Sequence, residues 1–216
     1  MKIHGFFLII TKPLFNFDII KKLLMDTDNL SIINYLNKRK LLSEDERKLI
    51  GEIFKEKYCA EGEIILNKGD ICGNIYFIES GALKTYFCDD ECREIINGIA
   101  IENNFCTSVA SFINQHPSRE FIKAIEKTKL IYINFRNFKQ LIEMHPAYQQ
   151  IYIKIIEDYL SFMTWRMESL VMMNSKKRYD TLMKIYPKLF LRIRNKDMAE
   201  YLGMTPETLS RIKALK

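Results

Sequence analysis

Residues 194–213 of this chain read RNKDMAEYLGMTPETLSRIK, the most informative segment for the structure of the C-terminal end. Its apolar spacing predicts two short helices, the first with Asn195 as N-cap. Gly203 supplies the positive φ with which a helix commonly ends. Thr205 is a suitable N-cap for the second helix, and Pro206 stands at the first helical position, where a missing N–H costs nothing. Capping, glycine turn and spacing therefore agree on a helix-turn-helix, although an ordinary helical hairpin is the alternative.

The second of these helices is expected to present polar groups to a DNA major groove. The residues expected to contact DNA are Thr205, Glu207, Thr208, Ser210, Arg211 and Lys213. A guanidinium can donate two hydrogen bonds to a guanine edge, so Arg211 is the candidate base reader. Glu207, four residues earlier, could hold that guanidinium or accept from a cytosine amine. Lys213 and the threonine hydroxyls suit phosphates, which position a protein on DNA without specifying sequence.

The charge of the chain is concentrated in the same region. Residues 175–216 hold 11 Lys or Arg against 4 Asp or Glu, a net charge of +7, whereas the whole chain carries +6. A polyanion therefore attracts this segment and not the rest of the protein. A basic, solvated face without a partner is the alternative interpretation.

Upstream of this region, the sequence predicts a long helix over Ala147–Met173. Apolar residues recur there in steps of 4, 3, 4 and 3, which is a heptad seam. Such a helix outruns a small β domain, so a second copy of the same helix is the simplest partner for the seam. The residues expected at this dimer interface are Tyr152, Ile155, Tyr159 and Phe162. The alternative is that the helix packs only on its own domain.

The middle of the chain changes to a β pattern. From about Lys57 to Ile133, short apolar runs alternate with Gly and Asp turns, which predicts an all-β barrel or sandwich. Residues up to about Glu56 are predicted to be helical, with a capping box formed by Ser43 and Glu46.

Composition excludes several classes of protein. Hydrophobic residues make up 48% and charged residues 28%, which suits a globular protein, and no apolar run reaches the length of a membrane span. The five cysteines lack the spacing of a disulfide framework or a metal site, and we expect ordinary free thiols: Cys59, Cys72, Cys88, Cys92 and Cys106. The apolar run near the N-terminus is too short for a signal peptide, and Met25 is an alternative start. No catalytic motif is found, so we expect no enzyme.

The sequence resembles the Crp–Fnr family of regulators over about residues 30–216. Its Gly-rich turns at Glu61–Glu63, Lys68–Asp70 and Ile75–Gly81 resemble those of the family's cyclic-nucleotide-binding β-roll, and Pro206–Arg211 resembles its recognition helix. Pro206 stands where that motif often has Arg, so one contact to DNA is expected to be missing. The resemblance implies an α+β fold with a β-roll, a long dimerisation helix and a helix-turn-helix, here lacking most of the C-terminal wing.

The corresponding domains are an N-terminal extension (1–29), a sensor domain (30–145), a dimerisation helix (146–174) and a DNA-binding domain (175–216). The resemblance also places an effector pocket in the sensor domain, with candidate residues Phe105, Thr107, Ser108 and Arg119. Cyclic-AMP binders use a Gly-Glu segment and an Arg-Ser/Thr pair. This chain has no Gly-Glu, and Arg119 is displaced by one position and followed by Glu120. A shift of one residue on a strand reverses the face of the side chain, so we expect an effector other than cyclic AMP.

The cofactor is left open. The N-terminal cysteine group of the oxygen-sensing relatives is absent, so no iron–sulfur cluster is expected. The histidines, His4, His116 and His145, give haem no support. We expect a cytoplasmic homodimer that regulates transcription from palindromic double-stranded DNA, with RNA polymerase as a further candidate partner and no membrane. The alternative is a ligand-sensing or protein-interaction module that does not bind DNA specifically.

Overall fold

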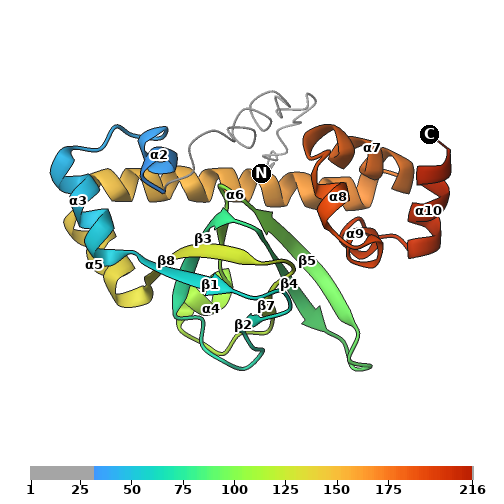
Figure 1. Cartoon of the computed structure of the whole chain (residues 1–216), viewed down its shortest axis with the longest axis horizontal. Helices are drawn as coiled ribbons and strands as arrows, with labels where there is room; N and C mark the ends of the chain where they lie inside the picture. The colour runs from blue at the N-terminus through green and yellow to red at the C-terminus, as the bar shows by residue number, and fades with distance from the viewer. Residues whose placement is uncertain (1–31, 216) are drawn as a thin grey trace, which may run out of the picture.

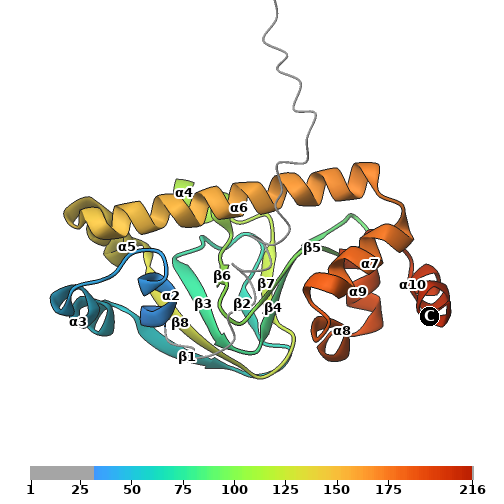
Figure 2. The same cartoon turned by 90° about the horizontal axis from the view of Figure 1, so that it is seen from above.

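The computed structural model describes residues 32–215. A β-sandwich lies in the middle, and the long helix α6 (Pro146–Met172) runs beside it along the whole length of the molecule (Figures 1 and 2). Helices α2 (Ile32–Asn37), α3 (Glu44–Ile53) and α5 (Phe135–Met144) lie at one end of α6. The C-terminal helices lie at the other end: α7 (Ser175–Ile185), α8 (Leu189–Arg192), α9 (Asn195–Tyr201) and α10 (Pro206–Ala214). The predicted extension 1–29, Met25 and His4 lie outside the described residues.

Within residues 32–215 the sandwich consists of two antiparallel four-stranded sheets. One sheet has the order β1-β8-β3-β6, formed by β1 (Lys55–Cys59), β8 (Thr128–Asn134), β3 (Asn74–Ser80) and β6 (Phe105–Cys106). The other has the order β2-β7-β4-β5, formed by β2 (Ile64–Leu66), β7 (Phe121–Ala124), β4 (Ala82–Cys88) and β5 (Glu94–Ile101). Helix α4 (Val109–Asn114) connects β6 to β7.

The middle of strand β3, Ile75–Ile78, is apolar without alternation because it is buried on both faces. Tyr76 and Ile78 point into the core between the sheets, whereas Phe77 belongs to a second core beneath α2, α3, α5 and α6. A strand that is buried on both faces cannot alternate apolar and polar residues. The second core also contains Tyr148 and Ile151, which anchor the first turns of α6.

Most predicted elements are confirmed, and the exceptions have physical reasons. The capping box of Ser43 and Glu46 opens α3 as expected. The helix predicted to continue to Glu56 is wrong, because β1 already begins at Lys55 and pairs with β8. β1 is an edge strand, where charged side chains prevent unwanted pairing with other strands. These charges interrupt the apolar pattern by which a strand is recognised in the sequence. The two-residue strand β6 and the short helix α4 had no recognisable signal.

Candidate nucleic-acid interface and ligand cavity

The helix pair at the C-terminus is built as its sequence predicts. The side chain of Thr205 accepts a hydrogen bond from the backbone N–H of Thr208 at 3.2 Å and caps α10, while Gly203 has φ +65°. The apolar residues whose spacing predicts the two helices are buried: Met198, Ala199, Leu202, Leu209 and Ile212. One detail is wrong, since Arg194 is the N-cap of α9 and Asn195 is its first residue.

The outer face of α10 carries the residues predicted to contact DNA. Glu207, Ser210 and Arg211 are exposed, and Thr208 and Lys213 are partly exposed. The Nη2 atom of Arg211 donates to Thr208 Oγ1 at 3.4 Å, so the threonine, not Glu207, makes the hydrogen bond that orients this guanidinium. Lys213 donates to the side chain of Asn195 at 2.5 Å and so also ties α10 to α9.

Two arginines that sequence reasoning missed hold the turn between α9 and α10. Arg178 of α7 donates to the carbonyl oxygens of Leu202 at 2.7 Å and Gly203 at 3.0 Å. Arg166 of α6 donates to the carbonyl oxygen of Tyr201 at 2.8 Å, with its guanidinium 4.0 Å from the centre of the Tyr201 ring. Helix ends leave carbonyl groups unsatisfied, and here the neighbouring helices satisfy them. The position of the turn is therefore coupled directly to α6.

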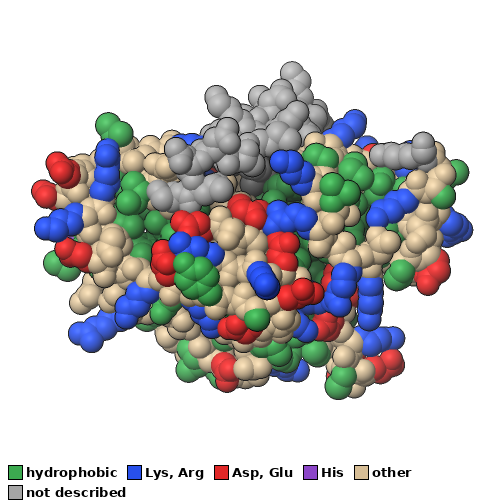
Figure 3. Space-filling model, viewed as in Figure 1, with side chains coloured by type: hydrophobic (Ala, Val, Ile, Leu, Met, Phe, Trp, Pro, Cys, Tyr) green, Lys and Arg blue, Asp and Glu red, His purple; other side chains and the backbone are tan. Residues whose placement is uncertain are grey.

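The surface around this helix pair is basic. Figure 3 shows Lys and Arg side chains gathered over the C-terminal helices, at the right of the view. This agrees with the net charge of +7 in residues 175–216. A basic surface around an exposed polar helix can bind the phosphates of a nucleic acid.

Helix α9 is also docked onto the sandwich through buried charges. Lys84 of β4 is 1% exposed, and its Nζ atom forms ion pairs with Glu94 of β5 and, at 3.1 Å, with Asp197 of α9. Asp197 in turn accepts from Arg194 at 2.9 Å. A buried charge is stable only when it is paired, so these partners determine where α9 sits on β4 and β5.

Three further contacts join the C-terminal helices to the sandwich. Arg192 forms ion pairs with Glu126 and, at 2.7 Å, with Glu102. Burial raises the pKa of Glu102, but hydrogen bonds from Arg192 and from backbone N–H groups, among them that of Gly81, act together with the charge of Arg192 and lower the pKa below its ordinary value. The backbone N–H of Ile96 donates to Glu200 of α9 at 3.3 Å, and burial raises the pKa of that carboxyl. No single feature of the sequence marked these long-range pairs.

The stripe of α6 predicted to form a dimer interface faces the sandwich of its own chain. Tyr152, Ile155 and Phe162 are partly buried, Tyr159 is 39% exposed, and all four line a cavity between α6 and the sandwich. A different row is more open: Ile153 is 49% exposed, Leu160 58% and Met167 62%. This row is turned by about a third of a helical turn from the predicted stripe.

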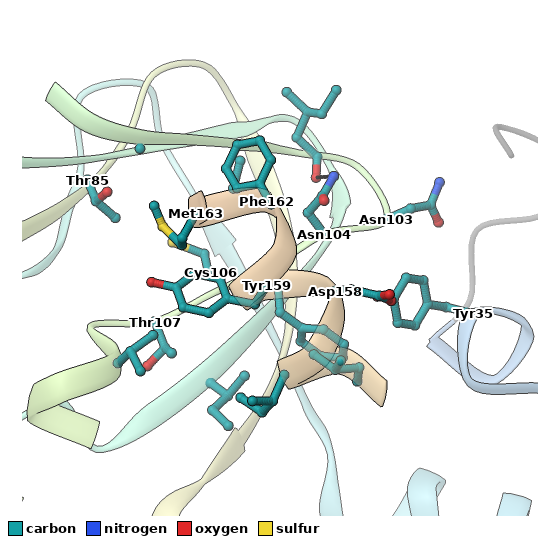
Figure 4. Close-up of a pocket in the computed structure, with 18 of the residues that line it drawn as sticks. Tyr35, Thr85, Asn103, Asn104, Cys106, Thr107, Asp158, Tyr159, Phe162 and Met163 are labelled. Atoms are coloured by element: carbon teal, nitrogen blue, oxygen red, sulfur yellow. Dashed lines mark hydrogen bonds between the residues drawn. The ribbon is translucent and has the colours of Figure 1, made fainter. Parts of the chain in front are cut away.

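The cavity has a volume of about 840 Å³. Figure 4 shows Tyr159, Phe162 and Met163 of α6 at this cavity, with Cys106 beside Met163 and Tyr159, and Thr85 and Thr107 farther from the helix. Of the predicted effector residues, Phe105 and Thr107 line this cavity. The other two do not: Ser108 is buried and accepts a hydrogen bond from Ser118, and Arg119 is exposed. Glu120 lines the cavity in place of Arg119.

Other kinds of site find little support in residues 32–215. All five cysteines are free thiols, of which Cys59, Cys72 and Cys106 are buried and Cys92 is exposed. No group of three or more His, Cys, Asp or Glu residues in this part of the chain could hold a metal ion. None of the described helices combines the length and the apolar character that crossing a membrane requires.

Comparison with known proteins gives consistent results. Residues 56–145 match the family described as the cyclic nucleotide-binding domain. Among curated relatives, the anaerobic regulatory protein of Haemophilus influenzae is 24% identical over 183 residues, covering 79% of this chain and 70% of the relative. The fumarate and nitrate reduction regulatory protein of Yersinia pestis is 25% identical over 187 residues, covering 79% and 72%.

Solved structures support the same fold. A variant of CooA from Carboxydothermus hydrogenoformans aligns with a TM-score of 0.65 and 22% identity, covering 87% of this chain and 84% of the other. FixK2 from Bradyrhizobium japonicum aligns with a TM-score of 0.66 and 16% identity, covering 76% and 84%. At these identities the structures establish the arrangement of sandwich, long helix and C-terminal helices.

Proposed function

Because this chain belongs to the Crp/Fnr family of DNA-binding transcription regulators and is not an enzyme, we propose that it is a sequence-specific regulator that reads a palindromic operator as a homodimer. The observation that carries this proposal is the exposed polar face of α10, with Glu207, Ser210 and Arg211 presented on a helix whose other face is buried. Such a helix enters the major groove, where Arg211 pairs with a guanine.

The exposed row on α6 supports a homodimer. Ile153, Leu160 and Met167 are seven residues apart, and Ile156, Met163 and Leu170 follow them at a spacing of three. These are the a and d positions of a heptad, which bury their side chains when two such helices pack together, and the d residues Ile156 and Met163 also border the cavity. The interface is therefore centred on this row, and Tyr152, Ile155, Tyr159 and Phe162 contribute toward the cavity. Two recognition helices then meet half-sites about one DNA turn, ~34 Å, apart.

The cavity next to α6 is the effector site of the proposed regulator. Cyclic AMP is not the expected effector, because Arg119 is exposed outside the cavity and the carboxylate of Glu120 lines it. A negative side chain repels a phosphate. Since α6 contacts both the cavity and the turn before α10, an effector that prefers one position of α6 shifts the recognition helices between two states.

The test is selection of bound sequences from a random pool of double-stranded DNA by the full chain, at several salt concentrations. The proposal predicts an enriched palindrome, and Arg211→Ala relaxes the selection at one base pair of each half-site. The alternative, a ligand-sensing or protein-interaction module, predicts no enrichment at low salt, with or without a cell extract that supplies effectors. Equal weakening by Arg211→Ala on every sequence would reject the assignment of Arg211 as a base reader.

A further inference from the structure

The cavity between the sandwich and α6 is lined mainly by apolar and aromatic side chains. Its aromatic walls include Tyr35, Phe105, Phe138, Tyr152, Tyr159 and Phe162. A volume of about 840 Å³ with a few polar groups on an apolar wall is typical of a small-molecule site. The body of a ligand that fits this cavity is therefore apolar.

The charged side chains that line the cavity are Arg39, Asp158 and Glu120. Arg39 and Asp158 neutralise each other, because Nη2 of Arg39 lies 3.1 Å from Oδ2 of Asp158, and the guanidinium also lies over the Tyr35 ring. Glu120 differs, because it forms no ion pair with any Lys or Arg in residues 32–215. Among the described residues, one negative charge in the cavity thus has no cationic partner.

Two neighbouring side chains hold the Glu120 carboxylate in place. Thr85 Oγ1 donates to Asn97 Oδ1 at 2.6 Å, and Asn97 Nδ2 donates to Glu120 Oε2 at 2.6 Å. This chain of hydrogen bonds ends on an acceptor. A carboxylate has about four acceptor positions, so the bond from Asn97 leaves capacity for a further donor. Tyr159 of α6 lines the same cavity as Glu120. Burial raises the pKa of Tyr159, and the charge of Glu120 adds to the rise.

We propose that the cavity binds an organic cation with an apolar body, whose N–H groups donate to Glu120 while its body packs against the aromatic side of α6. An unpaired carboxylate beside apolar walls is costly, and a cationic donor removes that cost. Aromatic rings such as Tyr159 and Phe162 also attract a cation. An anionic ligand, including any cyclic nucleotide, meets repulsion at the same place.

The same cavity explains how such a ligand could act on DNA binding. Its lining extends beyond the sandwich and α6 to Leu182 of α7 and Tyr201 of α9. Tyr201 belongs to the first helix of the helix-turn-helix, and its carbonyl oxygen is held by Arg166. A ligand would therefore touch the sensor and the DNA-binding helices directly. This regulatory step rests on the proposed function, whereas the chemistry of binding does not.

The experiment uses three probes with the same apolar body and different ends: 4-phenylbutylamine, 4-phenylbutanol and 4-phenylbutyrate. Their binding to the full chain is measured by isothermal titration calorimetry, with cyclic AMP as a fourth probe. We expect the amine to bind at least about tenfold more tightly than the carboxylate, because one charge-assisted hydrogen bond replaces one repulsion. Glu120→Gln abolishes that preference. Glu91→Gln, which removes the same charge from an exposed turn, leaves it unchanged.

Thermal unfolding first establishes that each variant is folded, and Asn97→Leu is a second variant that releases the carboxylate without changing charge. The proposal is overturned if the carboxylate or cyclic AMP binds as tightly as the amine, if no probe binds, or if Glu120→Gln keeps the preference. DNA selection with and without the amine separates the two hypotheses. Binding of the amine without any DNA selection rejects the regulator and retains the cation site. DNA selection without binding of the amine rejects the cation site and retains the regulator.

Discussion

The Nζ atom of Lys84 on β4 lies 3.1 Å from the Oδ1 atom of Asp197 on α9, and both side chains are almost completely buried. This pair connects the sandwich to the first helix of the DNA-binding region, across 113 positions of sequence. Since α9 and α10 share one turn, a contact that determines the position of α9 also determines the position of the recognition helix.

Replacement of one partner should therefore be costly. Lys84→Met leaves the buried Asp197 with only the exposed Arg194 as a partner and should lower the free energy of unfolding by about 3 kcal/mol in urea denaturation. The double variant Lys84→Met/Asp197→Leu should recover most of this loss, because an apolar pair often replaces a buried ion pair at little cost. The matched control is Lys123→Met, the lysine paired opposite on β7 and 26% exposed, which should cost below about 1 kcal/mol. Equal losses of unfolding free energy in Lys84→Met and Lys123→Met would show that burial of Lys84 has no special role.

Arg211 is the side chain on α10 best placed to read a base. Arg211→Ala should weaken binding to the selected operator by about 1–3 kcal/mol and relax discrimination at one base pair. Competition binding at fixed salt measures both effects. The control is Arg136→Ala, which removes the same charge from an exposed position on α5 and should leave specificity intact.

The exposed row of α6 predicts the subunit interface. Leu160→Glu places a charge in the centre of the seam and should convert the dimer to monomers in sedimentation velocity experiments. Tyr152→Glu tests the residue that the sequence pattern favoured. Because Tyr152 lines the cavity of its own chain, its variant should impair probe binding more than association. If Tyr152→Glu dissociates the dimer and Leu160→Glu does not, the interface lies on the stripe that the sequence pattern predicted.

Gly203 lies at a position where any side chain meets backbone strain and a close neighbour. Its φ is +65°, and an added Cβ would lie 2.9 Å from Leu170 Cδ2 on α6. Gly203→Ala should therefore destabilise the protein by about 1–2 kcal/mol, measured by thermal unfolding. Gly51→Ala is the matched control, because Gly51 lies inside α3 with no atom within 4 Å of the added methyl group. That variant should be neutral or stabilising by up to about 1 kcal/mol.

The ion pairs of Arg192 predict a dependence of stability on pH. The pKa of Glu102 in the folded protein is lower than the ordinary value of 4.5, so its contribution is fully present above that pH. It is lost as the pH falls through the lower folded pKa. Arg192→Gln should therefore flatten the acid limb of stability measured by urea denaturation between about pH 5 and 3. An unchanged acid limb would mean that the Glu102 carboxyl titrates alike in the folded and unfolded states.

Local sequence determined most of the elements of this protein. The caps at Ser43 and Thr205, the turn at Gly203 and the buried faces of α9 and α10 follow from interactions between residues a few positions apart. Such interactions are encoded in spacing, which a sequence displays directly. The assignment of α10 as the candidate DNA interface followed from the same kind of pattern.

Only the tertiary structure decided which face of α6 meets the sandwich and which remains open. The apolar residues of α6 form two neighbouring rows, and periodicity alone does not distinguish the stripe of Tyr152 from the row of Leu160. Likewise, Lys84 is one charged residue in a strand until α9 brings Asp197 to it, and Glu120 enters the cavity where Arg119 was expected. These outcomes depend on contacts between distant segments, whose free energy is set by burial and pairing in three dimensions and leaves no local trace in the chain.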